Sequence, residues 1–298
     1  MPKVLITGSN GLLGQKLVSL LADDTAYQVI ATGRGDNRNP AGAYTYLTMD
    51  ITKEVDIQQV IDNQKPDFVV NTAAMTHVDQ CQLHPKDCWK QNVQAVEYLV
   101  SSCAKSGSFL LHLSTDFIFD GAAGPYKEDD DPNPLSYYAE SKLASEKIIK
   151  NATIRWAIAR TMLVYGVAHD MSRSNIILWV KSNLEQNKPI KVVSDQWRMP
   201  TLAEDLATGC KLIIDQKAEG VFHLSGKDML TPYDIALKTA AFFELDSSLI
   251  TEVDGSIFSQ PAKRPARTGF ILDKAYRQLD YKPRSFDEGL ALLASQLP

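Results

Sequence analysis

The sequence has few cysteines, no long apolar run and no excess of positive charge, and each absence narrows its class. Its four cysteines among 298 residues include no Cys-x-x-Cys pair, so neither a disulfide framework nor a short-spaced zinc motif is expected. No stretch of about 18 apolar residues occurs, so we expect no membrane-spanning helix. The net charge of −5 lacks the basic character of a nucleic-acid-binding surface.

The N-terminal residues lack the charged-then-apolar arrangement of an export signal, and a strand is expected almost at once. We therefore expect a cytoplasmic protein with reduced thiols. The composition, 44% apolar and 22% charged, is typical of a globular protein, and the length allows one large domain or two moderate ones.

The first strand, loop and helix form a recognisable local pattern. Residues 4–6 are a short apolar run with β-branched side chains, which predicts a buried parallel strand. Gly8, Gly11 and Gly14 follow, and leucines then recur at helical spacing. Glycines let the backbone turn tightly beside a pyrophosphate, and the helix N-terminus offers free N–H groups. The pattern predicts a dinucleotide site, although its Gly-x-x-Gly-x-x-Gly spacing is also compatible with an ordinary tight turn.

The end of the second predicted strand, residues 27–32, indicates which dinucleotide binds. An acidic residue at this point binds the ribose 2′-hydroxyl in such folds, whereas an arginine accommodates a 2′-phosphate. Arg34 stands here, so the sequence favours NADP, and Asp36 nearby leaves NAD possible. A solvated loop arginine is the alternative. Residues 36–46 are then predicted to form a polar loop, and Thr52 to cap the next helix.

Two later segments carry side chains suited to proton transfer. The buried strand predicted at residues 109–113 delivers Thr115 to its carboxyl end, where ligands bind in doubly wound sheets. Tyr138 and Lys142 share one face of a predicted helix. We expect the Lys142 ammonium to lower the pKa of Tyr138 from its usual value of about 10. Tyr138 would then protonate the alkoxide left by hydride transfer to a ketone, while Thr115 holds the substrate oxygen.

Two clusters of possible metal ligands are better explained without a metal. The acidic run at residues 128–131 is expected to be solvated surface. The segment from 77 to 88 is expected to be a loop, because no paired ligands recur downstream and Pro85 breaks any single face. Its zinc-type side chains are His77, Asp79, Cys81, His84 and Cys88.

Strands and helices alternate regularly to about residue 160 and less regularly afterwards. The regular part, residues 1–160, predicts an α/β fold with a Rossmann-type, doubly wound parallel sheet that binds NADP. Residues 161–298 are predicted to form mainly a smaller α+β substrate lobe, with segments such as 200–226 able to return to the first domain. We expect the site in the cleft between the two.

Taken together, these motifs resemble the extended branch of the short-chain dehydrogenase/reductase superfamily, and within it the dTDP-4-dehydrorhamnose reductases. The matching segments span nearly the whole chain and are Thr7-Gly8…Gly14, Asp50-Ile51-Thr52, Pro66-Asp67…Asn71-Thr72-Ala73-Ala74, Val78-Asp79, Ser114-Thr115-Asp116…Phe119-Asp120-Gly121, Tyr138…Lys142-Leu143-Ala144…Glu146, Arg160-Thr161…Tyr165-Gly166, Pro200-Thr201…Asp205-Leu206-Ala207 and Arg264-Pro265.

The resemblance implies a catalytic trio, a cofactor-binding set and a substrate class. The trio is Thr115, Tyr138 and Lys142, and the last two also bind the cofactor. The substrate would be a nucleotide-linked 4-keto-6-deoxy sugar, and a homodimer is implied by analogy. Asp50 and Ile51 would lie near the adenine and Asn92 near the nicotinamide. The remaining cofactor-binding residues would be Gly8, Asn10, Gly11, Leu12, Leu13, Gly14, Arg34, Ala73 and Ala74.

Three positions depart from the pattern of rhamnose-type reductases. Phe117 stands where a tyrosine is usual, Leu163 where a tryptophan is usual, and Ala139 where a glycine is common. A second resemblance, to the regulatory β subunit of methionine adenosyltransferase, shares the leucine at 163. The intact trio favours an NADPH-dependent nucleotide-sugar reductase. The alternatives are a non-catalytic NADP-binding subunit and an epimerase or dehydratase that retains NAD.

Overall fold

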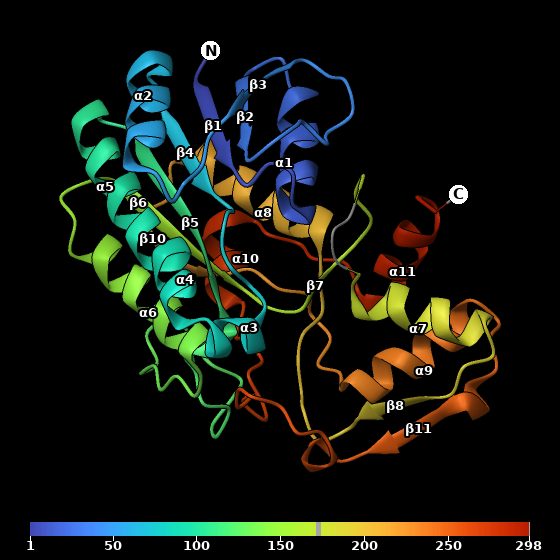
Figure 1. The fold of residues 1–298 in the computed structure, drawn as a ribbon. Coiled ribbons are helices and arrows are strands. Elements are labelled where there is room, and N and C mark those ends of the chain that lie inside the picture. The colour runs from blue at the N-terminus through green and yellow to red at the C-terminus, as the bar shows by residue number, and fades with distance from the viewer. Residues whose placement is uncertain (171–173, 298) are drawn as a thin grey trace.

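The computed structural model describes residues 1–170 and 174–297, and a seven-stranded sheet forms its centre (Figure 1). The strand order is β10-β6-β5-β4-β1-β2-β3, and every neighbouring pair is parallel. The strands are β1 (Lys3–Thr7), β2 (Gln28–Gly33), β3 (Tyr44–Thr48), β4 (Phe68–Asn71), β5 (Phe109–Thr115), β6 (Trp156–Thr161) and β10 (Gly220–His223). The α/β class and the parallel sheet predicted from the sequence are confirmed.

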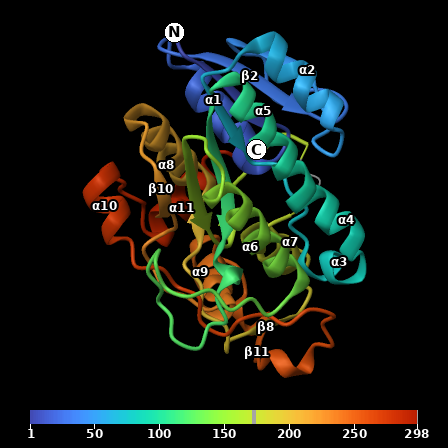
Figure 2. The ribbon, with the colours of Figure 1, turned by 90° about the vertical axis from the view of Figure 1, so that its left-hand side faces the viewer.

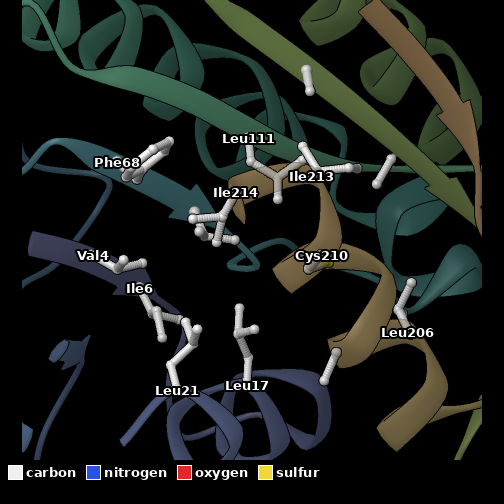
Figure 3. Packing of buried hydrophobic residues seen from close by; sticks show 14 of the residues in the cluster. Val4, Ile6, Leu17, Leu21, Phe68, Leu111, Leu206, Cys210, Ile213 and Ile214 are labelled. Carbon is white, nitrogen blue, oxygen red and sulfur yellow. The ribbon is translucent and has the colours of Figure 1, made fainter. Parts of the chain in front are cut away.

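Helices cover both faces of the sheet, because alternate residues of each strand point to opposite sides. On β1, Val4 and Ile6 belong to the cluster formed with α1, α8 and α10, whereas Leu5 between them packs with α2, α5 and α6. All three side chains are completely buried. Figure 3 shows part of the first cluster, with Leu17 and Leu21 on α1, Val4 and Ile6 on β1, and Ile213 beside Leu111.

The helices that build these two layers are mostly ten or more residues long. They are α1 (Leu12–Ala22), α2 (Glu54–Gln64), α5 (Ala95–Ser106), α6 (Tyr137–Lys150), α8 (Ala203–Gln216) and the shorter α10 (Asp273–Leu279). No helix in the described ranges is both long and apolar enough to cross a membrane.

The order of the strands reverses between β1 and β4. From β1 the chain builds outward through β2 to β3, then returns to β4 and continues through β5 to β6 on the other side. In open parallel sheets, ligands bind at the carboxyl ends of the strands beside such a switch point. The loop after β1 and the loop after β4 therefore mark the expected binding edge.

A smaller lobe follows in the second half of the chain. Its helices α7 (Ile176–Glu185) and α9 (Pro232–Phe242) pack together beside a parallel pair, β8 (Ile190–Val193) and β11 (Ile250–Val253). Figure 2 shows this pair at the end of the molecule opposite to the N-terminus. Between these elements the chain returns to the large sheet, where α8 packs on α1 and β10 forms the edge beside β6. The C-terminal helix is α11 (Phe286–Ala294).

Three local predictions were wrong. The loop predicted at residues 36–46 gives way at Tyr44 to the edge strand β3, whose alternation of tyrosine with threonine carries no apolar run. Thr52 does not cap α2; its amide and hydroxyl both donate to the Asp50 carboxylate instead. The loop predicted between residues 77 and 88 contains two short helices, α3 (Val78–Leu83) and α4 (Pro85–Trp89).

Candidate functional site

The loop between β1 and α1 requires glycine at two positions. Gly8 has φ +67°, and a Cβ there would lie 2.8 Å from the amide nitrogen of Ala73 in the loop after β4. A Cβ on Gly14 would lie 2.3 Å from the carbonyl oxygen of Gly8. Gly11 donates its N–H to that oxygen at 2.9 Å and precedes α1 without a side-chain cap. The first N–H groups of α1, from Leu12 and Leu13 onward, thus stand at the switch point, where an anion can bind.

Asn10 holds the loop that follows β2. Its Nδ2 donates to the Asp36 carbonyl at 2.9 Å and to the Tyr46 hydroxyl at 3.2 Å, and its Oδ1 accepts the Arg38 N–H at 2.9 Å. Arg34 lies exposed at the start of this loop. The side chain of Asn10, predicted to bind the cofactor, is thereby committed to shaping the segment that carries Arg34. The sequence pattern did not indicate this bridging role.

Asp50 and Ile51 lie beside the same strand end. The neighbouring Met49 donates its N–H to the Gly33 carbonyl at 3.0 Å, which brings this turn to the end of β2. Burial by itself would raise the pKa of Asp50, but hydrogen bonds from Thr52 and the positive charge of Arg34 outweigh it and lower that pKa. Asp50 is therefore ionised at neutral pH. Ile51 is buried under the sheet in the cluster with α2 and α5.

Asn92 fastens the loop after β4 to the helix that carries the predicted catalytic pair. It lies in a π-helical turn, Lys90–Gln94, a feature that often marks functional sites. Its Oδ1 accepts the Met75 N–H at 2.8 Å, and its Nδ2 donates to the Met75 carbonyl and to Ser141 Oγ, both at 3.0 Å. Asn92 therefore links the chain directly after Ala73-Ala74 to α6, through its bonds to Met75 and Ser141.

The predicted trio converges at the carboxyl end of β5. Thr115 ends that strand, and Tyr138 and Lys142 lie in the first two turns of α6, which begins after the cap residue Ser136. All three side chains are buried. The Thr115 hydroxyl accepts the Phe117 N–H at 3.2 Å and lies near enough to the Tyr138 phenol to lower its pKa. The sequence therefore located three groups that the fold brings together.

The predicted direction of the Tyr138 pKa shift was wrong. Burial raises this pKa above 10, the nearby Thr115 hydroxyl opposes the shift, and the Asp116 carboxylate adds to it. Lys142 does not lower the Tyr138 pKa against this effect of burial. Its Nζ is turned to other partners: it donates to the Leu113 carbonyl at 2.6 Å and lies 3.0 Å from His112 Nε2. Burial lowers the pKa of Lys142 itself to about 8. Tyr138 is consequently protonated at neutral pH, the form that donates a proton.

Asp116 and Arg198 belong to a buried network of polar side chains. The sequence pattern assigned no role to either residue. The Thr115 hydroxyl lies 3.1 Å from Asp116 Oδ1, and Thr268 donates to Oδ2. Arg198 Nε lies 3.8 Å from Oδ2, while its guanidinium donates to the Pro265 carbonyl at 2.6 Å. Burial raises the pKa of Asp116 despite the charge of Arg198. The network joins the end of β5 to the segments around Arg198 and Thr268, which are distant in the sequence.

The zinc-type side chains of residues 77–88 contact other parts of the protein. Asp79 pairs with Arg264, with Oδ2 to Nη2 at 2.7 Å and Oδ1 to Nη1 at 3.1 Å. His77 accepts the Gln80 N–H at the start of α3, and Cys81 and Cys88 are buried against Tyr138. Within residues 1–170 and 174–297, no group of three or more His, Cys, Asp or Glu side chains is placed to hold a metal ion.

The predicted solvation of the acidic run was wrong at Glu128. Its carboxylate accepts the His223 N–H at 3.1 Å, and its main-chain carbonyl accepts a bond from Arg160 at 3.0 Å. Burial raises the pKa of Glu128. The contact partners lie on β10 and β6, far along the sequence, so the local acidic pattern carried no signal for it.

Of the two main departures from the reductase pattern, Phe117 contacts the trio and Leu163 packs elsewhere. The Phe117 ring packs edge-on against Tyr138, with centroids 6.2 Å apart, and the Arg198 guanidinium lies 5.4 Å above the same ring. Leu163 has φ +40°, a left-handed conformation that costs a leucine energy. It follows β6 and packs against the cluster that contains Tyr165.

Known proteins share both the sequence and the architecture. The RmlD substrate binding domain family matches residues 2–297. A dTDP-4-dehydrorhamnose reductase of Aggregatibacter actinomycetemcomitans is 30% identical over 97% of both chains, and methionine adenosyltransferase 2 subunit beta of Bos taurus is 30% identical over 85% of this chain and 76% of its own. The crystal structure of a dTDP-4-dehydrorhamnose reductase from Clostridium acetobutylicum, 29% identical, matches 98% of both chains with a TM-score of 0.87. The resemblance inferred from the motifs is confirmed, and this chain belongs to the RmlD substrate binding domain family.

Proposed function

We propose that this protein is a reductase that uses NADPH to reduce the keto group of a nucleotide-linked 4-keto-6-deoxy sugar. The observation that carries the proposal is the convergence of Thr115, Tyr138 and Lys142 beside the glycine-rich loop, at one edge of the sheet. The family relationship supports the sugar class, because a reductase of dTDP-4-dehydrorhamnose is 30% identical over 97% of both chains.

The residues around the switch point fit a dinucleotide phosphate. The cofactor's pyrophosphate would lie against Gly8, Gly11 and the N-terminus of α1, where no side chain occupies the cap. Arg34 would bind the 2′-phosphate, since the end of β2 presents no carboxylate directly at the strand end. Asp50 would lie near the adenosine. Nicotinamide, when bound, supplies the hydride.

The protein's own groups would complete the reduction. Thr115 would hydrogen-bond the carbonyl oxygen and hold it for hydride attack. Tyr138, protonated at neutral pH, would donate its hydroxyl hydrogen to the oxygen as negative charge develops there. Lys142 would hydrogen-bond the nicotinamide ribose and so hold the ring beside Tyr138. The low exposure of all three side chains keeps water from competing for these bonds.

The direct test is NADPH oxidation, followed by absorbance, with dTDP-, GDP- and UDP-linked 4-keto-6-deoxy sugars. We expect turnover with one of them and a stronger response with NADPH than with NADH. If NADPH binds but no keto sugar causes oxidation, the reductase proposal fails.

A second candidate is a non-catalytic, NADP-binding regulatory subunit. It is favoured by Leu163, the residue that this chain shares with the methionine adenosyltransferase subunit where rhamnose-type reductases carry tryptophan. Under this alternative the protein binds NADPH without oxidising it and changes the activity of a partner enzyme. The same assay separates the two functions.

We also propose a homodimer acting in the cytoplasm. The four cysteines are all buried free thiols, as expected of a reducing compartment. Sedimentation equilibrium would give the mass of the assembly, and a monomer at all concentrations would contradict the dimer.

A further inference from the structure

A chain of buried polar side chains crosses the centre of the sheet and ends at Lys142. Thr7 Oγ1 on β1 donates to Asn71 Oδ1 on β4 at 2.6 Å. Asn71 Nδ2 lies 3.0 Å from His112 Nδ1 on β5. His112 Nε2 lies 3.0 Å from Lys142 Nζ on α6. None of the four residues is more than 2% exposed.

The lysine decides the direction of every bond in this chain. An ammonium has three N–H donors and no lone pair, so each neighbour must accept. A buried charge without acceptors is strongly unfavourable, and the two acceptors in contact with Nζ are the Leu113 carbonyl, at 2.6 Å, and His112 Nε2. Because Nε2 must then carry a lone pair, the hydrogen of the neutral ring has to be on Nδ1.

The Nδ1–H bond in turn requires a carbonyl oxygen from Asn71. The amide then donates to the Thr7 hydroxyl, which can act as donor or acceptor. In the opposite arrangement Asn71 Nδ2 faces the ring and Nε2–H points at Lys142, which forces the lysine to be neutral. In the structure Asn71 Oδ1 faces Thr7 and Nδ2 faces His112, so the Nδ1–H arrangement requires the amide to turn by 180°, which exchanges its oxygen and nitrogen at nearly the same positions. Ser145 Oγ, 3.3 Å from Nε2, donates to the Lys142 carbonyl at 2.7 Å and leaves the ring's lone pair to the lysine.

The charges around Lys142 favour its protonated form over a charged histidine. Burial lowers the pKa of Lys142 to about 8, and Glu146 on the same helix, with the thiols of Cys81 and Cys88 on α3 and α4, opposes a further fall. Burial and the lysine charge hold the pKa of His112 well below 6.5. At neutral pH the His112 ring is therefore uncharged and the Tyr138 phenol is protonated, while the Lys142 ammonium carries the positive charge.

We propose that His112, held by Asn71 in its Nδ1–H form, is the positioning residue of Lys142, accepting one ammonium hydrogen at Nε2 so that a single N–H remains for a ligand. With Leu113 taking the second hydrogen, the third is the one that would reach the nicotinamide ribose. The inference rests on the proposed catalytic role of Lys142. No motif in the sequence assigned a role to His112 or Asn71.

The tautomer can be measured without any turnover. The protein labelled with 15N-histidine is examined by long-range 1H–15N correlation NMR, which distinguishes Nδ1–H from Nε2–H rings among the five histidines. The His112 signals are identified as those lost in His112→Gln. We expect a neutral Nδ1–H ring between pH 6 and 7, where Lys142 is protonated. An Nε2–H ring, or a ring that titrates with a pKa near 6.5, would overturn the proposal.

Two matched variants separate positioning from structural support. In His112→Gln the amide oxygen can take the place of Nε2 and accept from Lys142, whereas in His112→Asn the shorter amide reaches only toward Asn71. We expect the glutamine variant to retain most of kcat. In the asparagine variant kcat should fall about tenfold, and the basic limb of its pH profile should move lower by about one unit, because the ammonium has lost an acceptor.

The outcomes are distinguishable from failure of the proposed function. Equal loss of kcat in both variants, with the basic limb unmoved, would make His112 a structural residue only and would refute the inference. If the wild-type protein reduces no keto sugar, the proposed function fails while the NMR measurement still decides the tautomer. Thermal unfolding of both variants checks that they are folded, and the wild-type NMR result stands even if one of them is not.

Discussion

Replacement of Gly14 by alanine tests whether the glycine-rich loop is shaped for a cofactor. Gly14 lies in the first turn of α1, and the added Cβ would lie 2.3 Å from the Gly8 carbonyl oxygen and 2.7 Å from Ser9 Cα. These are backbone atoms, so the loop itself has to move. Overpacking of this kind costs about 1–3 kcal/mol, and alanine regains roughly 1 kcal/mol of helix propensity. The net loss of stability should therefore stay below about 2 kcal/mol.

The larger effect should be on binding. Gly8 has φ +67° and lies too near the Ala73 amide to accept a Cβ, so displacement of its carbonyl moves the surface that would face the pyrophosphate. We expect the Kd for NADPH, measured by fluorescence titration, to rise at least about tenfold, equivalent to about 1.4 kcal/mol. Wild-type affinity in a folded Gly14→Ala protein would refute this account of the loop.

Gly209→Ala is the matched control. Gly209 also lies inside a helix, α8, and its Cβ would meet Leu224 Cδ1 at 2.8 Å. That atom is the end of a flexible side chain, which can rotate, and it lies in the core rather than in the loop. Stability should change by less than about 1 kcal/mol and NADPH affinity should not change.

Three further predictions address the proposed chemistry and the core. Tyr138→Phe should lower kcat by about 10²–10⁴-fold in the NADPH oxidation assay while NADPH still binds, and unchanged turnover would remove Tyr138 as the proton donor. Arg34→Asp should shift the NADPH:NADH ratio of kcat/KM toward NADH by about 10–100-fold, whereas an unaltered ratio would contradict the 2′-phosphate role. Glu146 and Arg160 form a bidentate ion pair at 2.8 and 2.9 Å, and their side chains are at most 2% exposed. Glu146→Leu leaves the Arg160 guanidinium buried without its carboxylate, so it should lower the free energy of unfolding in urea by about 3–5 kcal/mol. Burial opposes ionisation of Glu146, but Arg160 outweighs this effect and lowers the pKa of the carboxyl below 4.5. The ion pair therefore stabilises the fold above pH 4.5, and this stabilisation is lost as the pH falls through the lowered pKa. A wild-type protein equally stable at pH 3 and pH 7 would contradict this linkage.

Much of the large sheet was predictable because its signals are local. Each central strand is a short apolar run, and such runs are buried on both faces only in a parallel sheet covered by helices. The start of α9 also carries a local signal, because Thr231 caps it, Pro232 follows as the first helical residue and Asp234 completes the capping box. Edge strand β3 escaped detection because an edge needs only one partner and tolerates polar side chains.

The sequence by itself determined the groups that define the candidate site: the glycines of the first loop, Thr115 after a buried strand, and Tyr138 one helical turn before Lys142. These relations depend on backbone geometry over a few residues, which neighbouring sequence specifies.

Only the tertiary structure decided how those groups behave. It turned Lys142 toward His112 rather than toward a role in lowering the Tyr138 pKa, because burial, which no local pattern reports, dominates that pKa. It also joined Asp116 to Arg198 and Thr268, and Asp79 to Arg264, across long stretches of chain. Desolvation and long-range pairing depend on which surfaces meet after folding, so they follow from the packed arrangement and not from spacing along the chain.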